Sequence, residues 1–268
     1  MFSAGVGLQP SKSNNYLEIV MKFNNLKVAV LAALILSPAI AFAQETTAEE
    51  VESNLSFNAQ VVSDYVFRGI SQTNGVMAVQ GGADYAFGDS GFYLGAWGSN
   101  TNFGYQAAPD WEIDFYGGWA YDINETFFTD LSYIYYTYYG ADAGEPSSNY
   151  GEFIAKFGMT DIAVLTVAYA DDYSGLGGSA TYVNLGNSWD LGKGYSINAG
   201  FGRTFQDSSL ENNAGLLDYN DWNVGFAKNW GIITVALNYY DTDLPSDYFQ
   251  PLRDEASDAV VLTFKISN

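Results

Sequence analysis

In the stretch NLSFNAQVVSDYVFR, residues 54–68, most apolar and polar side chains alternate. Leu55 and Phe57 fall on one face of an extended chain, and Asn58 and Gln60 fall on the other. Successive side chains of a strand point to opposite sides of a sheet, so this pattern predicts a strand with one apolar and one polar face.

Eleven further stretches of strand character follow, at about residues 76–87, 92–99, 111–121, 126–138, 150–158, 163–170, 179–189, 195–205, 221–228, 232–240 and 257–266. The links inside this series are alternately tight and long. The tight links are rich in Gly, Asp and Asn, which suit turns, and lie at residues 88–91, 122–125, 159–162, 190–194 and 229–231. The intervening long links include residues 100–110, 139–149, 206–220 and 241–256.

An even number of strands with short turns at one end and long loops at the other is typical of a barrel that crosses a bacterial outer membrane. A β-sandwich has Greek-key connections, which do not sort their lengths in this way. We therefore predict an all-β fold: a single antiparallel transmembrane β-barrel of about twelve strands, with short periplasmic turns and long extracellular loops.

The start of the chain predicts export. Lys22 and Lys27 precede an apolar run at 28–36, and the run is followed by Pro38 and the sequence Ala41-Phe42-Ala43. This is the pattern of a signal peptide, predicted at 21–43 with cleavage before residue 44.

Residues 1–20 are then a mis-called upstream extension, 44–53 an acidic disordered tail with four Glu, and 54–268 the barrel. No later segment reaches eighteen consecutive apolar residues, so a membrane role must use strands.

Composition excludes several functions. The chain has 31 Asp and Glu against 10 Lys and Arg, a formal net charge of -21, which excludes nucleic acid as a partner. It has no Cys and no His, which removes disulfides, Ser-His and Cys-His catalysis and the usual zinc sites. We expect no enzyme, no cofactor and no metal site. Glu112 and Asp114 are the weak alternative, because two carboxylates suffice for glycoside hydrolysis.

Aromatic residues are abundant, with 21 Tyr, 18 Phe and 6 Trp. A transmembrane barrel uses such residues in girdles at its two interfaces with the headgroups, whereas a soluble fold would use them to fill its core. We predict that the rings near the ends of the predicted strands lie in these girdles: Trp111, Tyr121, Phe127, Tyr195, Trp222 and Trp230.

Three motifs carry a family resemblance. They are SDYVFRGISQ at 63–72, QGGADY at 80–85 and SGFYLGAWGSN at 90–100, continued by EIDFYGG at 112–118. Together they resemble the TorF family of proteins described as porins, whose transport role is itself inferred. The resemblance implies an outer-membrane channel and no particular substrate. Such proteins tend to end in an aromatic residue, whereas this chain ends in Ile266-Ser267-Asn268, with Phe264 as the nearest substitute.

The same alternation predicts which side chains line a pore. Charged groups cannot face lipid, so we assign to the lumen Asp64, Arg68, Asp84, Glu112, Asp114, Tyr116, Asp130, Glu152 and Lys156. Arg68 is the first residue of interest, because it is the only Arg in the first half of the mature chain and lies in the motif at 63–72. We expect it on the first strand, reaching across the lumen towards Asp114 or Asp84. There it would set a transverse field that screens solutes by charge, or simply neutralise buried carboxylates.

The long links are acidic, and an acidic mouth concentrates cations. We therefore expect a porin-like channel for passive diffusion of small solutes or ions, with a weak cation preference, in the cell outer membrane. Its partners are membrane lipid, lipopolysaccharide and the diffusing solutes. A non-conducting structural or adhesive barrel is the alternative. The sequence leaves open the solute, the openness of the lumen and assembly into a homo-oligomer.

Overall fold

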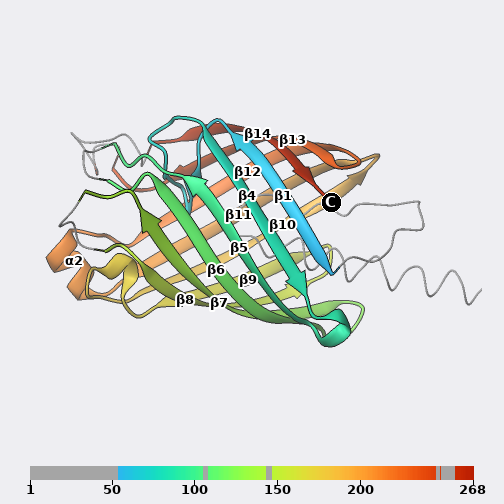
Figure 1. Ribbon diagram of the computed structural model, residues 1–268, viewed down its shortest axis with the longest axis horizontal. Coiled ribbons are helices and arrows are strands. Elements are labelled where there is room, and N and C mark those ends of the chain that lie inside the picture. Colours follow the sequence, from blue (N-terminus) through green and yellow to red (C-terminus); the bar gives the residue numbers. More distant parts are fainter. Residues whose placement is uncertain (1–53, 105–107, 143–146, 246–247, 249–256) are drawn as a thin grey trace, which may run out of the picture.

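The structure is a computed structural model that describes residues 54–268 except 105–107, 143–146, 246–247 and 249–256 (Figure 1). The predictions for residues 1–20, 21–43 and 44–53 lie outside the described residues.

Twelve antiparallel strands close into one barrel, so the predicted fold is confirmed. Each strand pairs with the strand that follows it in the barrel, and β1 closes the ring by pairing with β14. The twelve are β1 (Leu55–Val62), β4 (Ala78–Ala86), β5 (Phe92–Asn100), β6 (Trp111–Asp122), β7 (Phe127–Tyr139), β8 (Tyr150–Met159), β9 (Ala163–Ala170), β10 (Ala180–Gly192), β11 (Tyr195–Gln206), β12 (Tyr219–Trp230), β13 (Ile233–Thr242) and β14 (Ala259–Ser267).

The two faces of the wall differ as the alternation predicts. On β1, Phe57 is 52% exposed on the outside, whereas Gln60 is only 8% exposed on the inside. The same contrast repeats around the barrel, where apolar side chains cover the outer face and polar ones the inner face. Four of the six predicted girdle rings are exposed on the outer face, namely Trp111, Tyr121, Tyr195 and Trp230, and the other two are half-exposed.

The links divide the barrel into two ends. We call the end with the tight links at 87–91, 123–126, 160–162, 193–194 and 231–232 the turn end, and the opposite end the loop end. The tight turn between β10 and β11 has positive φ at Gly192, Lys193 and Gly194, a conformation that glycine adopts without strain. Both the start of β1 and the end of β14 lie at the turn end.

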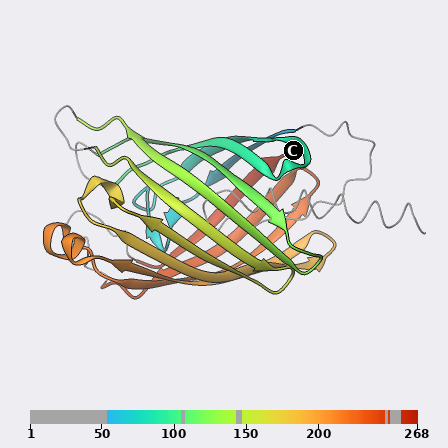
Figure 2. The ribbon, with the colours of Figure 1, turned by 90° about the horizontal axis from the view of Figure 1, so that it is seen from below.

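The prediction for the first strand was wrong beyond Val62. The chain leaves the wall after that residue, although Tyr65 and Phe67 continue the alternating pattern. Residues 63–77, here called the inward segment, instead form a loop containing the two-stranded hairpin of β2 (Val66–Phe67) and β3 (Ile70–Ser71). In Figure 2 these short strands lie inside the ring of long strands.

Within the described residues, helical structure is confined to short pieces: η1 (Gly88–Ser90), η2 (Tyr173–Gly175) and α2 (Ser208–Ala214). In the part of the chain that the structure describes, none of them has the length and apolar character to cross a bilayer. Asp207 caps the N-terminus of α2: its Oδ1 accepts hydrogen bonds from the backbone N–H groups of Ser209 and Leu210.

Asp207 gives this loop a pH dependence. Hydrogen bonds from the backbone of Ser179 and Leu210 lower the pKa of the Asp207 carboxyl below its ordinary value. Its stabilisation is therefore present above the pKa of the unfolded chain, about 3.9, and is lost as the pH falls through the lower folded value. Hydrogen exchange at Leu210 should show protection at neutral pH that declines in acid. In an Asp207→Asn variant this acid dependence should be weaker, and an identical decline in both would contradict the assignment.

Candidate functional site

The inward segment crosses the lumen from one wall to the other. It leaves from β1, and Arg68 reaches β8 on the far side of the ring, where its Nη2 donates to Oε2 of Glu152 at 2.7 Å. The guanidinium also lies over the ring of Tyr182 on β10, at 4.3 Å from its centroid. Because the side chains of Arg68 and Glu152 are only 7% and 1% exposed, this is a buried ion pair inside the barrel.

The tip of the hairpin adopts an unusual backbone. Arg68 and Gly69 have φ of 49° and 80°, the two positive values that a type I′ hairpin turn requires. Asn is usual at the first of these positions, so an Arg there is held by its surroundings. A Cβ on Gly69 would lie 2.3 Å from Cγ2 of Thr242 and 2.9 Å from Cβ of Asp221. The turn is therefore packed against β12 and β13, and only glycine fits.

Asp64 holds the base of the inward segment. Its Oδ1 accepts hydrogen bonds from Ser71 Oγ at 2.6 Å and Thr73 Oγ1 at 2.8 Å. The hydroxyl of Thr73 in turn accepts from the backbone N–H of Tyr65 at 2.9 Å. These bonds make the segment an ordered part of the interior.

Most carboxylates inside the barrel accept a hydrogen bond from a tyrosine hydroxyl on another strand. A buried carboxylate needs such donors, because burial removes its water. The pairs are Asp84 with Tyr116 at 2.5 Å, Glu112 with Tyr138 at 2.9 Å, Asp130 with Tyr93 at 3.1 Å, Glu152 with Tyr136 at 3.1 Å and Asp221 with Tyr182 at 3.1 Å. One oxygen each of Glu112, Glu152 and Asp221 is also buried without a hydrogen bond, but Asp114 differs because no tyrosine of the described residues donates to it and its Oδ1 is buried without a partner.

The structure brings all nine predicted lumen residues inside the barrel, eight of them buried and Lys156 half-buried. Two details of the prediction were wrong. Asp64 and Arg68 lie on the inward segment and not on a strand of the wall, and Arg68 pairs with Glu152 instead of Asp114 or Asp84.

Sequence reasoning missed the tyrosines that hold these carboxylates, together with Asp221. These tyrosines occupy inward positions of their strands, so the alternation of inward and outward residues could have identified them: Tyr93, Tyr136, Tyr138 and Tyr182. They were overlooked because tyrosine suits both a girdle and a lumen.

The inner wall has two contrasting sectors. From β5 to β8 it is filled by large rings and branched chains, among them Trp97, Ile134 and Tyr150. From β10 to β13 large inward rings lie only near the loop end, namely Tyr182, Tyr219 and Tyr240. The rest of this sector carries small groups and amides, namely Asn184, Gly186, Asn198, Gly200, Gly202, Asn223, Gly225 and Asn238.

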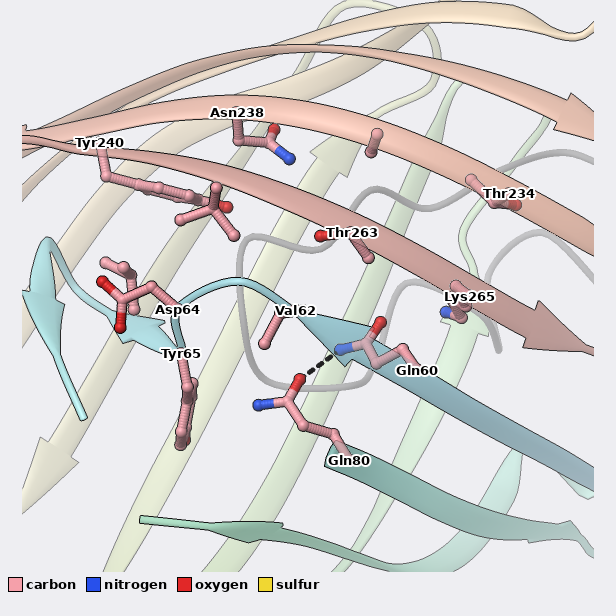
Figure 3. A pocket seen from close by; sticks show the side chains of 13 residues that line it. Gln60, Val62, Asp64, Tyr65, Gln80, Thr234, Asn238, Tyr240, Thr263 and Lys265 are labelled. Atoms are coloured by element: carbon pink, nitrogen blue, oxygen red, sulfur yellow. Dashed lines mark hydrogen bonds between the residues drawn. The ribbon is translucent and has the colours of Figure 1, made fainter. Parts of the chain in front are cut away.

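A small cavity lies beside the base of the inward segment, with Asp64 and Tyr65 at one end and Thr234 and Lys265 towards the turn end (Figure 3). Its volume is about 30 Å³, enough for one or two water molecules. Across it Gln60 Nε2 donates to Gln80 Oε1 at 2.5 Å. The lumen beside the hairpin is thus narrow, which makes the inward segment the candidate constriction.

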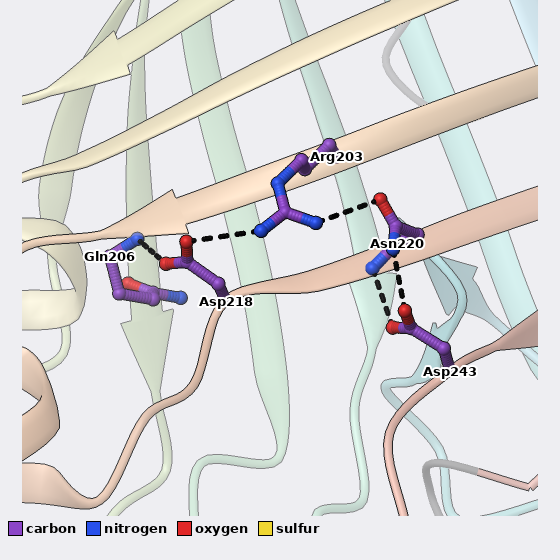
Figure 4. Close-up of polar contacts among 5 residues, drawn as sticks. All are labelled: Arg203, Gln206, Asp218, Asn220 and Asp243. Carbon is purple, nitrogen blue, oxygen red and sulfur yellow. Dashed lines mark hydrogen bonds and ion pairs between the residues drawn. The ribbon is translucent and has the colours of Figure 1, made fainter.

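A second polar network lies on the outer surface at the loop end (Figure 4). Arg203 on β11 donates to Asn220 at 3.1 Å and to Asp218 at 3.3 Å. Asn220 donates through its side chain to Asp243 at 2.5 Å. The network connects the link after β11 to the link after β13. Because the Arg203 side chain is well exposed, we expect its ion pair with Asp218 to contribute little to the stability of the fold.

Comparison with solved structures shows the same fold in porins. A structure described as NanC porin in a rhombohedral crystal form has a TM-score of 0.51 at 7% identity, covering 80% of this chain and 98% of that one. A KdgM porin gives 0.48 at 10% identity, covering 79% and 97%. The COG4313 outer membrane channel from Pseudomonas putida F1 gives 0.44 at 9% identity, covering 84% and 99%.

Sequence comparison places the chain in a family. None of the curated proteins matches it. Residues 46–267, which include the whole barrel, match the family described as bacterial protein of unknown function (Gcw_chp). The chain therefore belongs to the Gcw_chp family.

Proposed function

We propose that the protein is a porin-like channel of the outer membrane, through which small solutes or ions diffuse passively past the inward segment. The single observation that carries this proposal is the closed barrel whose apolar outer face surrounds a polar, charged interior. An apolar outer face suits lipid, and a polar, charged interior is typical of barrels that pass water and solutes.

Location and partners follow from the same reasoning. The outer face and its aromatic rings suit a bilayer, and the signal peptide predicted at 21–43 would deliver the chain to it. Lipid and lipopolysaccharide are then the proposed partners of the outer surface. The same surface can also pack against a second copy of the barrel in a homo-oligomer. The resemblance of residues 63–72 to the TorF family supports a transport role, and no catalytic role is proposed.

The interior favours cations. Near the loop end, the described part of the lumen holds four buried carboxylates, those of Glu112, Asp114, Glu152 and Asp221, and one guanidinium, that of Arg68, which is paired with Glu152. A surplus of carboxylates in a narrow passage lowers the energy of a cation and raises that of an anion. The acidic loops add to this at the mouth.

This selectivity has a direct test. In planar bilayers with a KCl gradient, the reversal potential should indicate a preference for K⁺, stronger at low ionic strength, where charges are less screened. Replacing Glu112 by Gln should reduce the preference. As a control, Asp161→Asn alters an exposed carboxylate in a tight turn at the turn end, away from the acidic loops, and should leave the preference nearly unchanged. A preference for Cl⁻ at low salt would contradict the proposed selectivity.

A structural or adhesive barrel is the second candidate, and one observation favours it. At the loop end the inward side chains of the wall, among them Tyr136, Glu152 and Tyr182, are buried under the hairpin. Liposome swelling with small sugars distinguishes the two: proteoliposomes should swell faster than empty liposomes if the barrel conducts, and at the same rate if it does not.

A further inference from the structure

We propose that Asp114, Glu112 and the rings around them form a binding site for a small organic cation with a primary ammonium group. The inference deepens the proposed channel function, because it names a class of solute that the constriction retains. It rests on an unpartnered buried carboxylate and on the aromatic surfaces that face it.

Asp114 is the exceptional carboxylate of the interior. It is 1% exposed, and its Oδ1 has no hydrogen-bond partner. Two residues along the same face of β6, Glu112 is 2% exposed and accepts from Tyr138 through Oε1. The hydroxyl of Tyr65 also lies close to this carboxylate, although Oε2 has no well-formed hydrogen bond. The buried Oδ1 of Asp114 is thus without a donor beside a carboxylate that is only partly satisfied, in a place that water hardly reaches. Such an arrangement is costly unless a donor or a positive charge joins it.

Aromatic rings flank Asp114 on both sides. In the sheet register it lies directly opposite Trp97 on β5 and Tyr136 on β7, and all three side chains point inward. Residues opposed in this way have Cβ atoms about 4.5–5.5 Å apart. Tyr65 of the inward segment packs edge-on against Trp97, with ring centroids 5.5 Å apart. The carboxylates of Asp114 and Glu112 are therefore lined by the rings of Trp97 and Tyr136 on the barrel wall and of Tyr65 on the inward segment. We call these five residues the box.

No protein cation neutralises this box in the described structure. Arg68, the nearest basic group on the inward segment, is engaged by Glu152 and by the face of Tyr182. The described residues also contain no group of three or more carboxylates arranged to hold a metal ion. A box of two carboxylates and aromatic faces suits a monovalent organic cation better than a divalent ion.

The donor requirement selects the kind of ammonium. A primary ammonium has three N–H donors and can satisfy Asp114 Oδ1 and Glu112 Oε2 while its carbon contacts the rings. A quaternary ammonium offers only the charge. Because Tyr65 belongs to the inward segment, a displacement of that segment would open the box from the loop end.

The test measures binding in the folded, detergent-solubilised protein, independently of conduction. Trp97 is the buried tryptophan of the box, so its fluorescence should change saturably when methylammonium is titrated. The change should be absent in a Trp97→Phe variant. Affinity for methylammonium should fall by about 10- to 100-fold in Asp114→Asn, the range expected for loss of a charged hydrogen bond. Tetramethylammonium should bind more weakly than methylammonium to the unmodified protein.

Asp84→Asn is the matched control. Asp84 is also a buried carboxylate of the lumen, but Tyr116 satisfies it, so affinity should change little. Equal loss in Asp84→Asn and Asp114→Asn would overturn the site, since it would show a general effect of lumen charge. So would the absence of saturable binding at neutral and alkaline pH, which would mean that the carboxyl pair keeps a proton in place of a cation. A protein that binds methylammonium but passes no current would refute the channel and leave the site standing.

Discussion

Replacing Arg68 by alanine is expected to lower the free energy of unfolding by about 3–5 kcal/mol, because it leaves Glu152 as a buried charge without its partner. The same change should raise the single-channel conductance, since the guanidinium that ties the hairpin to β8 and β10 is gone. Urea unfolding in detergent measures the first effect and planar-bilayer recording the second.

A double variant separates the loss of the Arg68 contacts that hold the hairpin from the cost of the unpaired charge on Glu152. In Arg68→Met with Glu152→Gln, no unpaired charge remains, so most of the lost stability should return while the conductance stays high. Arg68→Lys keeps a charge but lacks the planar guanidinium, and should lie between the two. If Arg68→Ala loses stability without any change in conductance or ion selectivity, Arg68 has a structural role only, and the hairpin is not the constriction.

Placing an arginine on the outer face is expected to be the most damaging change in the wall. Val224 lies at the middle of β12 and is 55% exposed on the outer face. Val224→Arg should lower the free energy of unfolding in lipid by about 2–4 kcal/mol, the cost of a basic side chain at the centre of a bilayer.

The neighbouring residue provides the matched control. Asn223 points into the lumen and is half-buried, so Asn223→Arg places the same side chain on the polar inner face of the wall. Its cost should be clearly smaller. Equal costs, or a larger cost for Asn223→Arg, would contradict a lipid-facing outer surface. Both variants can be compared by refolding into vesicles over a urea series.

The sequence predicted the wall well, because a strand exposed to different media on its two faces must alternate. On β6 the inward positions of Glu112, Asp114 and Tyr116 were assigned from the alternation alone, and Gly, Asp and Asn marked the tight links. The alternation gave a wrong prediction after Val62, because Tyr65 and Phe67 continue the apolar–polar pattern of a strand although the chain has left the sheet. Only Gly69 marks the turn, and its partner in the positive-φ pair is an arginine instead of asparagine.

The site was predictable in composition but not in pairing. Inward parity gave the carboxylates at 112, 114 and 152, whereas the partner of Arg68 depends on where the hairpin folds across the ring. That position is fixed by contacts far apart in the chain, such as Gly69 against Thr242. No local pattern records such contacts. The exceptional state of Asp114 was invisible for the same reason, since it depends on which tyrosine reaches which carboxylate.

The most direct test uses the absence of cysteine from the chain, which makes each introduced cysteine unique. Spin labels attached singly at 184, 185, 223 and 224, in protein reconstituted in lipid bilayers, report access to oxygen in lipid and to a polar relaxation agent in water. We predict oxygen access at 185 and 224 and polar access at 184 and 223. Labels that are equally accessible to the polar agent at all four positions would show that the outer face is not in lipid, and the channel proposal would fall with it.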